Sequence, residues 1–316
     1  MSLLSQVSSS PMLREYAQGL AQSAAQPVAD FLAPTVPVAT SVGRFKSYTE
    51  KDRFRIPVTL RAIGGRATEL GFAVTDKTYN CQPHALDYPV DRLEEMESDQ
   101  IENALMEGAR MISEVAALAH EQQVINAALE KLGAGTTVNW SGASGTPSDP
   151  VNDIDGQILS VIKNAAYGSA MGTGVLFGAT AWRNFKNNVN VRNKFVVGPG
   201  ARGGSAGLAI PTEELAGSLL VGNPECRVSY MVYDSAPEGK TQAMSFLLDN
   251  ACVVFARRDT PDRRDPSFMK TFRLAGQFMV PGAYLRDDNR VEVAKFDWSE
   301  DVQITNPNAA NLLAVT

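Results

Sequence analysis

The stretch "SDQIENALMEGARMISEVAALAHEQQVINAALEKL", residues 98–132, decides the fold class. Its apolar residues recur mostly every three or four positions between polar ones, which is the pattern of an amphipathic helix. At 1.5 Å per residue such a helix is roughly 50 Å long, whereas the average globular helix has only about 11–12 residues. We therefore expect a strut along which other elements pack. Its apolar stripe includes Ile101, Leu105, Ile112 and Leu129.

The segment before this helix has a different period. In "DRFRIPVTLRAIGG", residues 52–65, apolar and polar residues alternate, which predicts a strand with one apolar face. Gly64 and Gly65 predict a hairpin turn into a second strand through residues 67–74. A lone two-stranded ribbon is marginal in water, so we expect another surface, such as that of another chain, to cover it. The apolar face consists of Phe54, Ile56, Val58 and Leu60.

The rest of the chain mixes helices and strands. Residues 133–150 form a link rich in Gly, Ser and Thr, and a compact α/β region follows. There Asp153 is expected to cap a helix through Ile162, and further helices are expected near residues 179–195 and 212–220. Later strands are expected in "CRVSYMVYDSA", "AMSFLLDNACVVFARR", "FMKTFRLAGQF" and "VEVAKFDWSEDVQIT". The predicted class is α+β.

The stretch "FVVGPGARGG", residues 195–204, contains a GxGxxG pattern at Gly198, Gly200 and Gly203. A dinucleotide site needs a helix directly after the third glycine. Here "GSAGLAIP" follows, and its glycines and proline predict no helix. We interpret residues 198–210 as a flexible loop without a ligand.

Other chemical signatures are also missing from the sequence. The chain has two histidines and three cysteines, without CxxC or HExxH spacing, so neither a zinc site nor a disulfide framework is expected. The basic residues of "ARRDTPDRRD" are interleaved with aspartates, which favours ion pairs within the chain or with a neighbour over a nucleic-acid patch. These basic residues are Arg257, Arg258, Arg263 and Arg264.

Composition narrows the class further. The chain has 316 residues, 44% of them hydrophobic, with a formal net charge of -6. An acidic balance argues against a dedicated nucleic-acid binder. No apolar run approaches the roughly 20 residues of a membrane span, and no signal peptide is expected. We expect a soluble protein made in a cytoplasm.

The order of these elements resembles the major capsid protein of tailed bacteriophages, the Hong Kong 97-like fold. The resemblance covers nearly the whole chain and includes the phrases "DRFRIPVTLRAIGGRATELGFAVTDKTY", "DIDGQILSVIKNA", "PECRVSYMVYDS" and "MVPGAYLRDDNRVEVAKFDW". It implies an N-terminal arm (1–45), an E-loop hairpin (46–85), a peripheral domain with the spine helix (86–150), an axial domain (151–255), and strands returning to both domains (256–316).

The resemblance also implies a structural function. Copies of the chain would assemble into hexamers and pentamers of an icosahedral shell that encloses double-stranded DNA without sequence-specific binding, with no catalytic residues, cofactor or metal. A separate scaffolding protein, a portal and a decoration protein would be further partners, and no membrane would be involved. The shell would form in the cytoplasm of a bacterial host and become the virion capsid. The loop with Gly198, Gly200 and Gly203 would lie near the capsomer centre.

Two alternatives remain at this point. An encapsulin-like compartment has the same fold and holds enzyme cargo in place of DNA. An α/β enzyme that binds a nucleotide or sugar would need convergent polar groups, and no motif in the sequence supplies them.

Overall fold

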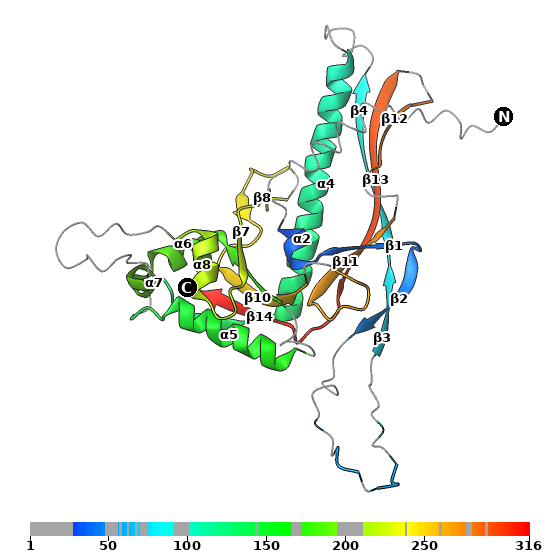
Figure 1. Ribbon diagram of the computed structural model, residues 1–316. Helices are drawn as coiled ribbons and strands as arrows, with labels where there is room; N and C mark the ends of the chain where they lie inside the picture. The colour runs from blue at the N-terminus through cyan, green and yellow to red at the C-terminus, as the bar shows by residue number, and fades with distance from the viewer. Residues whose placement is uncertain are drawn as a thin grey trace. The chain divides into compact units, whose positions relative to one another are not determined.

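The computed structural model describes residues 28–47, 56, 59–61, 63–66, 69, 75–91, 101–142, 145–165, 172–194, 211–237, 239–258, 261–275, 280–287 and 290–316. The chain divides into two units, each assembled from segments that are distant in the sequence (Figure 1). The first takes the described parts of residues 1–43, 78–126 and 271–303. The second takes those of 44–77, 127–270 and 304–316.

A five-stranded sheet organises the first unit. Its order is β1, β11, β13 and β12, with β4 also paired to β13. β1 runs parallel to β11, whereas β4 and β12 are antiparallel to β13. The short helix α2 (Ala29–Leu32) precedes β1. The strands are β1 (Thr35–Val38), β4 (Gln82–Asp91), β11 (Met269–Leu274), β12 (Val280–Leu285) and β13 (Val291–Ile304).

The long helix α4 (Ile101–Leu132) packs on this sheet (Figure 1). The prediction of one long helix ending at Leu132 is confirmed, and residues 92–100 lie outside the described residues. Alternate residues of β13 face the helix, as the two-residue period of a strand requires. Helix positions three, four and seven apart meet them, and this seam is a core cluster. It contains Val90, Leu105, Ala109, Ile112, Ala116, Ala294, Phe296 and Trp298.

Gly108 lets α4 approach β4 closely. A Cβ at this position would lie 2.4 Å from Cδ1 of Tyr88, well inside the contact distance of two carbon atoms. The helix therefore carries a glycine in its interior, where alanine is intrinsically better by about 1 kcal/mol, because the Tyr88 ring occupies the space of a side chain.

β4 lies at an edge of the sheet. Among the described strands it pairs with β13 alone, opposite Glu292 to Glu300 for most of its length. Pro83 pairs with Ser299 and Pro89 pairs with Val293. The two prolines are an even number of residues apart, so they share one face of the strand. Proline has no amide proton to donate, and it is tolerated in strands where that position faces away from a partner.

A second five-stranded sheet organises the second unit, in the order β5, β14, β10, β6 and β7. β10 is antiparallel to β14 and β6, whereas β7 is parallel to β6 and β5 is parallel to β14. The strands are β5 (Thr136–Val138), β6 (Gly172–Gly178), β7 (Glu225–Ser229), β10 (Ala251–Arg257) and β14 (Ala310–Val315). The helices are α5 (Pro150–Asn164), α6 (Ala179–Asn187), α7 (Val189–Lys194) and α8 (Glu213–Leu219).

The helix α5 begins one turn earlier than predicted. Its cap is Asp149, whose Oδ1 accepts the Val151 amide at 3.1 Å, so the expected cap at Asp153 is wrong. Asp153 instead accepts hydrogen bonds from Trp140 Nε1 (3.0 Å) and Ser148 Oγ (2.7 Å). These bonds fix the link that precedes the helix.

Two small ribbons complete the described strands. β2 (Val42–Ser47) pairs with β3 (Thr75–Asn80), and β8 (Val232–Asp234) pairs with β9 (Met244–Phe246). The expected strand through residues 54–60 is wrong for its described residues, because Ile56, Thr59 and Leu60 belong to no strand. The paired strands flank this segment instead. The apolar alternation therefore marks the connection between β2 and β3, where no described strand pairs with it.

We predict that Gly108→Ala lowers the free energy of unfolding by about 1–3 kcal/mol, because the new methyl group overpacks the contact with Tyr88. In a Tyr88→Ala background the same change should stabilise the protein, because only the helix propensity remains. Urea denaturation of the four proteins of this cycle measures the coupling. Equal effects of Gly108→Ala in both backgrounds would contradict the close contact.

Candidate functional site

The connection between β2 and β3 carries the most exposed apolar side chains described in the chain. Ile56, Leu60 and Ile63 are 92%, 90% and 106% exposed. Burying a large aliphatic side chain stabilises a protein or complex by roughly 1.5–3 kcal/mol. Burial of these three side chains by another surface would therefore be strongly favourable. They make this connection a candidate surface for contact with another molecule.

The expected turn of this connection is present. Gly64 has φ +79°, in the left-handed region that favours glycine, and Arg61 Nη1 donates to the Gly65 carbonyl at 2.9 Å. Phe54 and Val58 lie outside the described residues. The contact of this surface with a neighbouring subunit remains a prediction.

A buried carboxylate, Glu300, organises the polar interior of the first unit. It is 1% exposed and accepts hydrogen bonds from His120 Nδ1 (2.9 Å), Arg273 Nη2 (2.8 Å) and Trp298 Nε1 (3.2 Å). Burial acts to raise the pKa of Glu300, but the bonds and charges of His120 and Arg273 outweigh it and lower the pKa to about 2. Glu300 is therefore ionised at neutral pH.

The neighbouring Glu121 binds the N-terminal segment. It is 2% exposed, and its Oε1 accepts the Ala29 amide at 2.8 Å. Its other oxygen, Oε2, is buried without a hydrogen-bond partner among the described residues. Burial raises the pKa of Glu121 above its ordinary value. The bond from the Ala29 amide, the charge of His120 and the Val28 amide offset this only in part.

The charged loop of the second unit lies next to ion pairs within the chain. Glu225 on β7 accepts a hydrogen bond from Arg257 and lies 2.8 Å from Arg227 Nη2. Arg258, Arg263 and Arg264 lie on the exposed surface. Lys270, at the start of β11, is fully buried and donates to the backbone carbonyls of Asp262 and Asp265, which holds the loop in place. Contacts of these arginines with another subunit remain a prediction.

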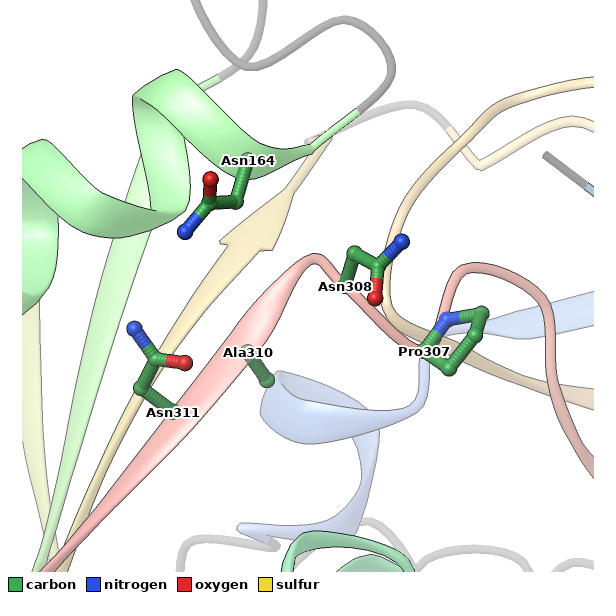
Figure 2. A pocket seen from close by; sticks show the side chains of 5 residues that line it. All are labelled: Asn164, Pro307, Asn308, Ala310 and Asn311. Atoms are coloured by element: carbon green, nitrogen blue, oxygen red, sulfur yellow. The ribbon is translucent and has the colours of Figure 1, made fainter. Parts of the chain in front are cut away.

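An open depression in the second unit is lined by polar but uncharged groups. Figure 2 shows the amides of Asn164, Asn308 and Asn311 around it, with Pro307 and Ala310 completing the wall. Asn164 Nδ2 already donates to Ser160 Oγ at 3.0 Å. Amides do not titrate near neutral pH and are poor nucleophiles, so this lining offers no acid, base or nucleophile for catalysis.

The remaining features considered in the sequence analysis are a metal site, a membrane span, the glycine-rich loop and the long helix. In the described part of the chain, no three His, Cys, Asp or Glu side chains gather as a metal site requires, and no described helix is long and apolar enough to cross a membrane. Gly198, Gly200 and Gly203 lie outside the described residues. The four helix residues singled out from the sequence all fall in α4, with Leu105 and Ile112 buried in its seam and Leu129 half-buried near its end.

Comparison with known proteins identifies the fold. No family model and no curated protein sequence matches the chain. Solved structures do match over almost its full length. A phage-related protein of Bordetella bronchiseptica RB50 is 17% identical with a TM-score of 0.66, and the match covers 96% of both chains. The putative capsid protein of a prophage of E. coli CFT073 is 10% identical with a TM-score of 0.57, over 98% and 99% of the two chains.

The chain has the Hong Kong 97-like capsid fold. The encapsulin of Synechococcus elongatus PCC 7942 is also similar, with 13% identity and a TM-score of 0.54 over 93% of this chain and 88% of that one. The fold expected from the order of elements is thus confirmed.

Sequence reasoning missed the buried carboxylate network. His120 was interpretable only as a histidine of the long helix. Its partner Glu300 lies 180 positions away, and Arg273, the other partner of Glu300, is also distant from His120 in the sequence. One signal was available. Glu300 and Trp298 alternate with Ser299 in a strand, so the charged residue had to share the apolar face of that strand.

We predict that Glu121→Gln raises the free energy of unfolding at pH 7, because the amide keeps the oxygen that accepts the Ala29 bond and removes a buried charge. Because the pKa of Glu121 is higher in the folded than in the unfolded state, ionisation of Glu121 destabilises the wild-type fold at pH values above its folded-state pKa. Below the ordinary pKa of 4.5 the group is protonated in both states and the destabilisation is absent. The gain should therefore vanish on acidification to about pH 4. Urea denaturation at a series of pH values tests this. A loss of stability at pH 7 would show that the charge itself is needed.

Glu300→Gln should have the opposite effect. It removes the anion between His120 and Arg273, and breaking a buried ion pair costs about 3–5 kcal/mol. The lowered pKa of Glu300 stabilises the wild type above pH 4.5, and this contribution is lost as the pH falls toward 2. The free energy of unfolding of the variant should not show this decrease between pH 4.5 and pH 2. A thermal melt unchanged from wild type at pH 7 would argue against the network.

Proposed function

We propose that the chain is the major capsid protein of a tailed bacteriophage or prophage, which self-assembles into hexamers and pentamers of an icosahedral shell. The observation that carries the proposal is the match of its fold to phage-related and prophage capsid proteins across almost the whole of both chains. A capsid subunit needs surfaces that are satisfied only after assembly. The exposed Ile56, Leu60 and Ile63 are such a surface.

The contacts in such a shell are heterologous, because a patch on one copy meets a different patch on the next copy. Interfaces of this kind generate rings when the rotation closes. The apolar connection between β2 and β3 then lies against a neighbouring subunit and loses its exposed area there. The N-terminal segment, anchored at Ala29 by Glu121, supplies another arm for contacts between copies.

The shell encloses double-stranded DNA without reading its sequence. A net charge of -6 fits this role, because a strongly basic inner wall would hold the DNA and impede its packaging. The protein acts without catalysis or a cofactor. Scaffolding, portal and decoration proteins are its expected partners, and assembly takes place in the cytoplasm of the bacterial host.

An encapsulin-like compartment is the second candidate, favoured by the similarity to the Synechococcus encapsulin. The phage-related protein (TM-score 0.66) and the prophage capsid protein (0.57) both score above the encapsulin (0.54), which supports the phage capsid. The contents of purified particles separate the two. Nuclease-protected DNA supports the capsid, whereas a stoichiometric protein cargo without DNA supports the compartment.

Purified wild-type protein should form capsomers or closed shells that electron microscopy resolves. The triple variant Ile56→Ser, Leu60→Ser and Ile63→Ser should remain folded but lose assembly, because it removes the apolar area that a neighbour covers. A matched control replaces three exposed polar residues of the same connection, Thr59→Ser, Arg66→Gln and Glu69→Gln, and leaves the net charge unchanged. A wild-type protein that stays monomeric at every concentration would refute the proposed function. Normal shells from the triple variant would refute the role of the connection.

A further inference from the structure

Acidic residues are absent from one long stretch of this chain. Residues 156–212 contain no aspartate and no glutamate, although the whole chain has 35 of them in 316 residues. The same stretch contains six of the 29 lysines and arginines. The rest of the chain therefore holds all 35 acidic residues against the other 23 basic ones, and an acidic protein carries one segment of purely positive charge.

Burial explains only part of this charge pattern. β6 belongs to the stretch and is largely buried, where a charge would be unfavourable. The helices α6 and α7 belong to it too, but they carry exposed polar residues. They follow each other with Asn188 between them and lie side by side (Figure 1). Their lack of acidic residues needs another reason.

Helix stability does not supply that reason. An acidic residue in the first turn of a helix is stabilised by the positive end of the helix dipole, yet the first turns of α6 and α7 contain none. Asn190 takes such a position in α7, and Asn184 lies in the interior of α6. Asparagine is a poorer helix former than glutamate. Negative charge is thus missing where these helices would gain from it.

Three cations of these helices make no ion pair with any described residue. Arg183 and Arg192 are exposed and Lys186 is half-buried, and we call the three residues the basic patch. Two acidic residues from other segments do reach the helices. Asp149 pairs with Lys194 at 2.7 Å, and Asp249 Oδ1 accepts the amide of Thr180 at 3.3 Å. Neither of these bonds neutralises the basic patch.

The three cations lie close to one another. Arg183 and Lys186 are three positions apart on α6, so they are neighbours on one side of the helix. Arg192 reaches back from α7 to the end of α6, where its Nε donates to the Lys186 carbonyl at 3.4 Å and its Nη2 donates to Asn187 Oδ1 at 3.0 Å. A guanidinium has five N–H donors, so three remain for a partner. The patch is therefore a positioned group of donors.

A phosphate backbone suits this patch better than a protein surface does. The centre of a protein interface is depleted of charged residues and enriched in aromatic ones. Here cations and amides dominate, and Val189 is the one large aliphatic side chain of α6 and α7 that stands exposed. At least half of the hydrogen bonds between proteins and DNA go to phosphate and sugar, with arginine, lysine and asparagine among the donors.

We propose that the basic patch of Arg183, Lys186 and Arg192 binds the phosphate backbone of double-stranded DNA. The contact rests on the proposed function, in which the shell encloses DNA, and it requires α6 and α7 to face the interior. It reads no base sequence, because phosphates carry none. Three cations in a chain of net charge -6 form a weak contact, so DNA lies against the wall without being held there during packaging.

The salt dependence of DNA binding tests the patch. Full-length wild-type subunits and the variant Arg183→Gln, Lys186→Gln, Arg192→Gln are titrated with a short fluorescent duplex at a series of salt concentrations. Each phosphate contact contributes about -0.9 to the slope of log K against log salt concentration. The variant should therefore have a slope shallower by about 2–3 and bind at least tenfold more weakly at low salt, for every duplex sequence alike.

A matched control removes the same charge elsewhere. Lys131→Gln, Lys240→Gln and Arg286→Gln change three exposed cations outside α6 and α7, and this control should keep the wild-type slope. Both variants should show the wild-type circular dichroism spectrum. An unchanged slope in the patch variant overturns the proposal. An equal loss in the control also overturns it, because net charge alone would then be responsible.

Two further measurements separate the alternatives. Poly-L-glutamate should bind wild-type subunits more weakly than DNA, and equally tight binding that the patch variant loses would assign the patch to an acidic protein and overturn the DNA contact. Electron microscopy of wild-type shells should place α6 and α7 on the inner surface. Shells with these helices outside overturn the contact alone, whereas a wild type that never forms shells refutes the proposed function.

Discussion

The ionised carboxylate of Glu300 is the constraint on which the first unit depends. It lies on β13 with its charge buried, and a buried charge is tolerated only with full compensation. His120 from α4 and Arg273 from β11 provide it. Arg273 Nη1 also donates to Thr35 Oγ1 of β1 at 3.4 Å. One anion thus fixes the register of a helix and two strands, and through β1 it orders the beginning of the described chain.

The long helix and the main strands could be predicted because their burial follows a simple period. Leu105, Ile112 and their neighbours repeat along α4, and β10 lies in the predicted apolar stretch "AMSFLLDNACVVFARR". β4 was not predicted, because Pro83 and Pro89 interrupt its pattern and its partner β13 lies some 200 residues further along the chain. β12 and β14 are short segments whose place is decided by pairing with distant strands, which local patterns do not reveal.

The apolar alternation of residues 54–60 shows a second limit of sequence patterns. A period of two records that one side of an extended segment is apolar, but it does not say which surface will cover that side. In this chain the described residues of the segment stand exposed outside any strand. A pattern that usually marks a strand of the core here marks an exposed connection.

The prolines of β4 bear on whether another strand can add to this edge of the sheet. An open strand edge is the simplest place for one protein chain to add to another, and edge-to-edge addition propagates without end into ribbons and fibres. Pro83 and Pro89 remove hydrogen-bond donors from a ten-residue edge strand and deprive that route of regular pairing. Addition of another strand at this edge of the sheet is thus disfavoured by two missing amide protons.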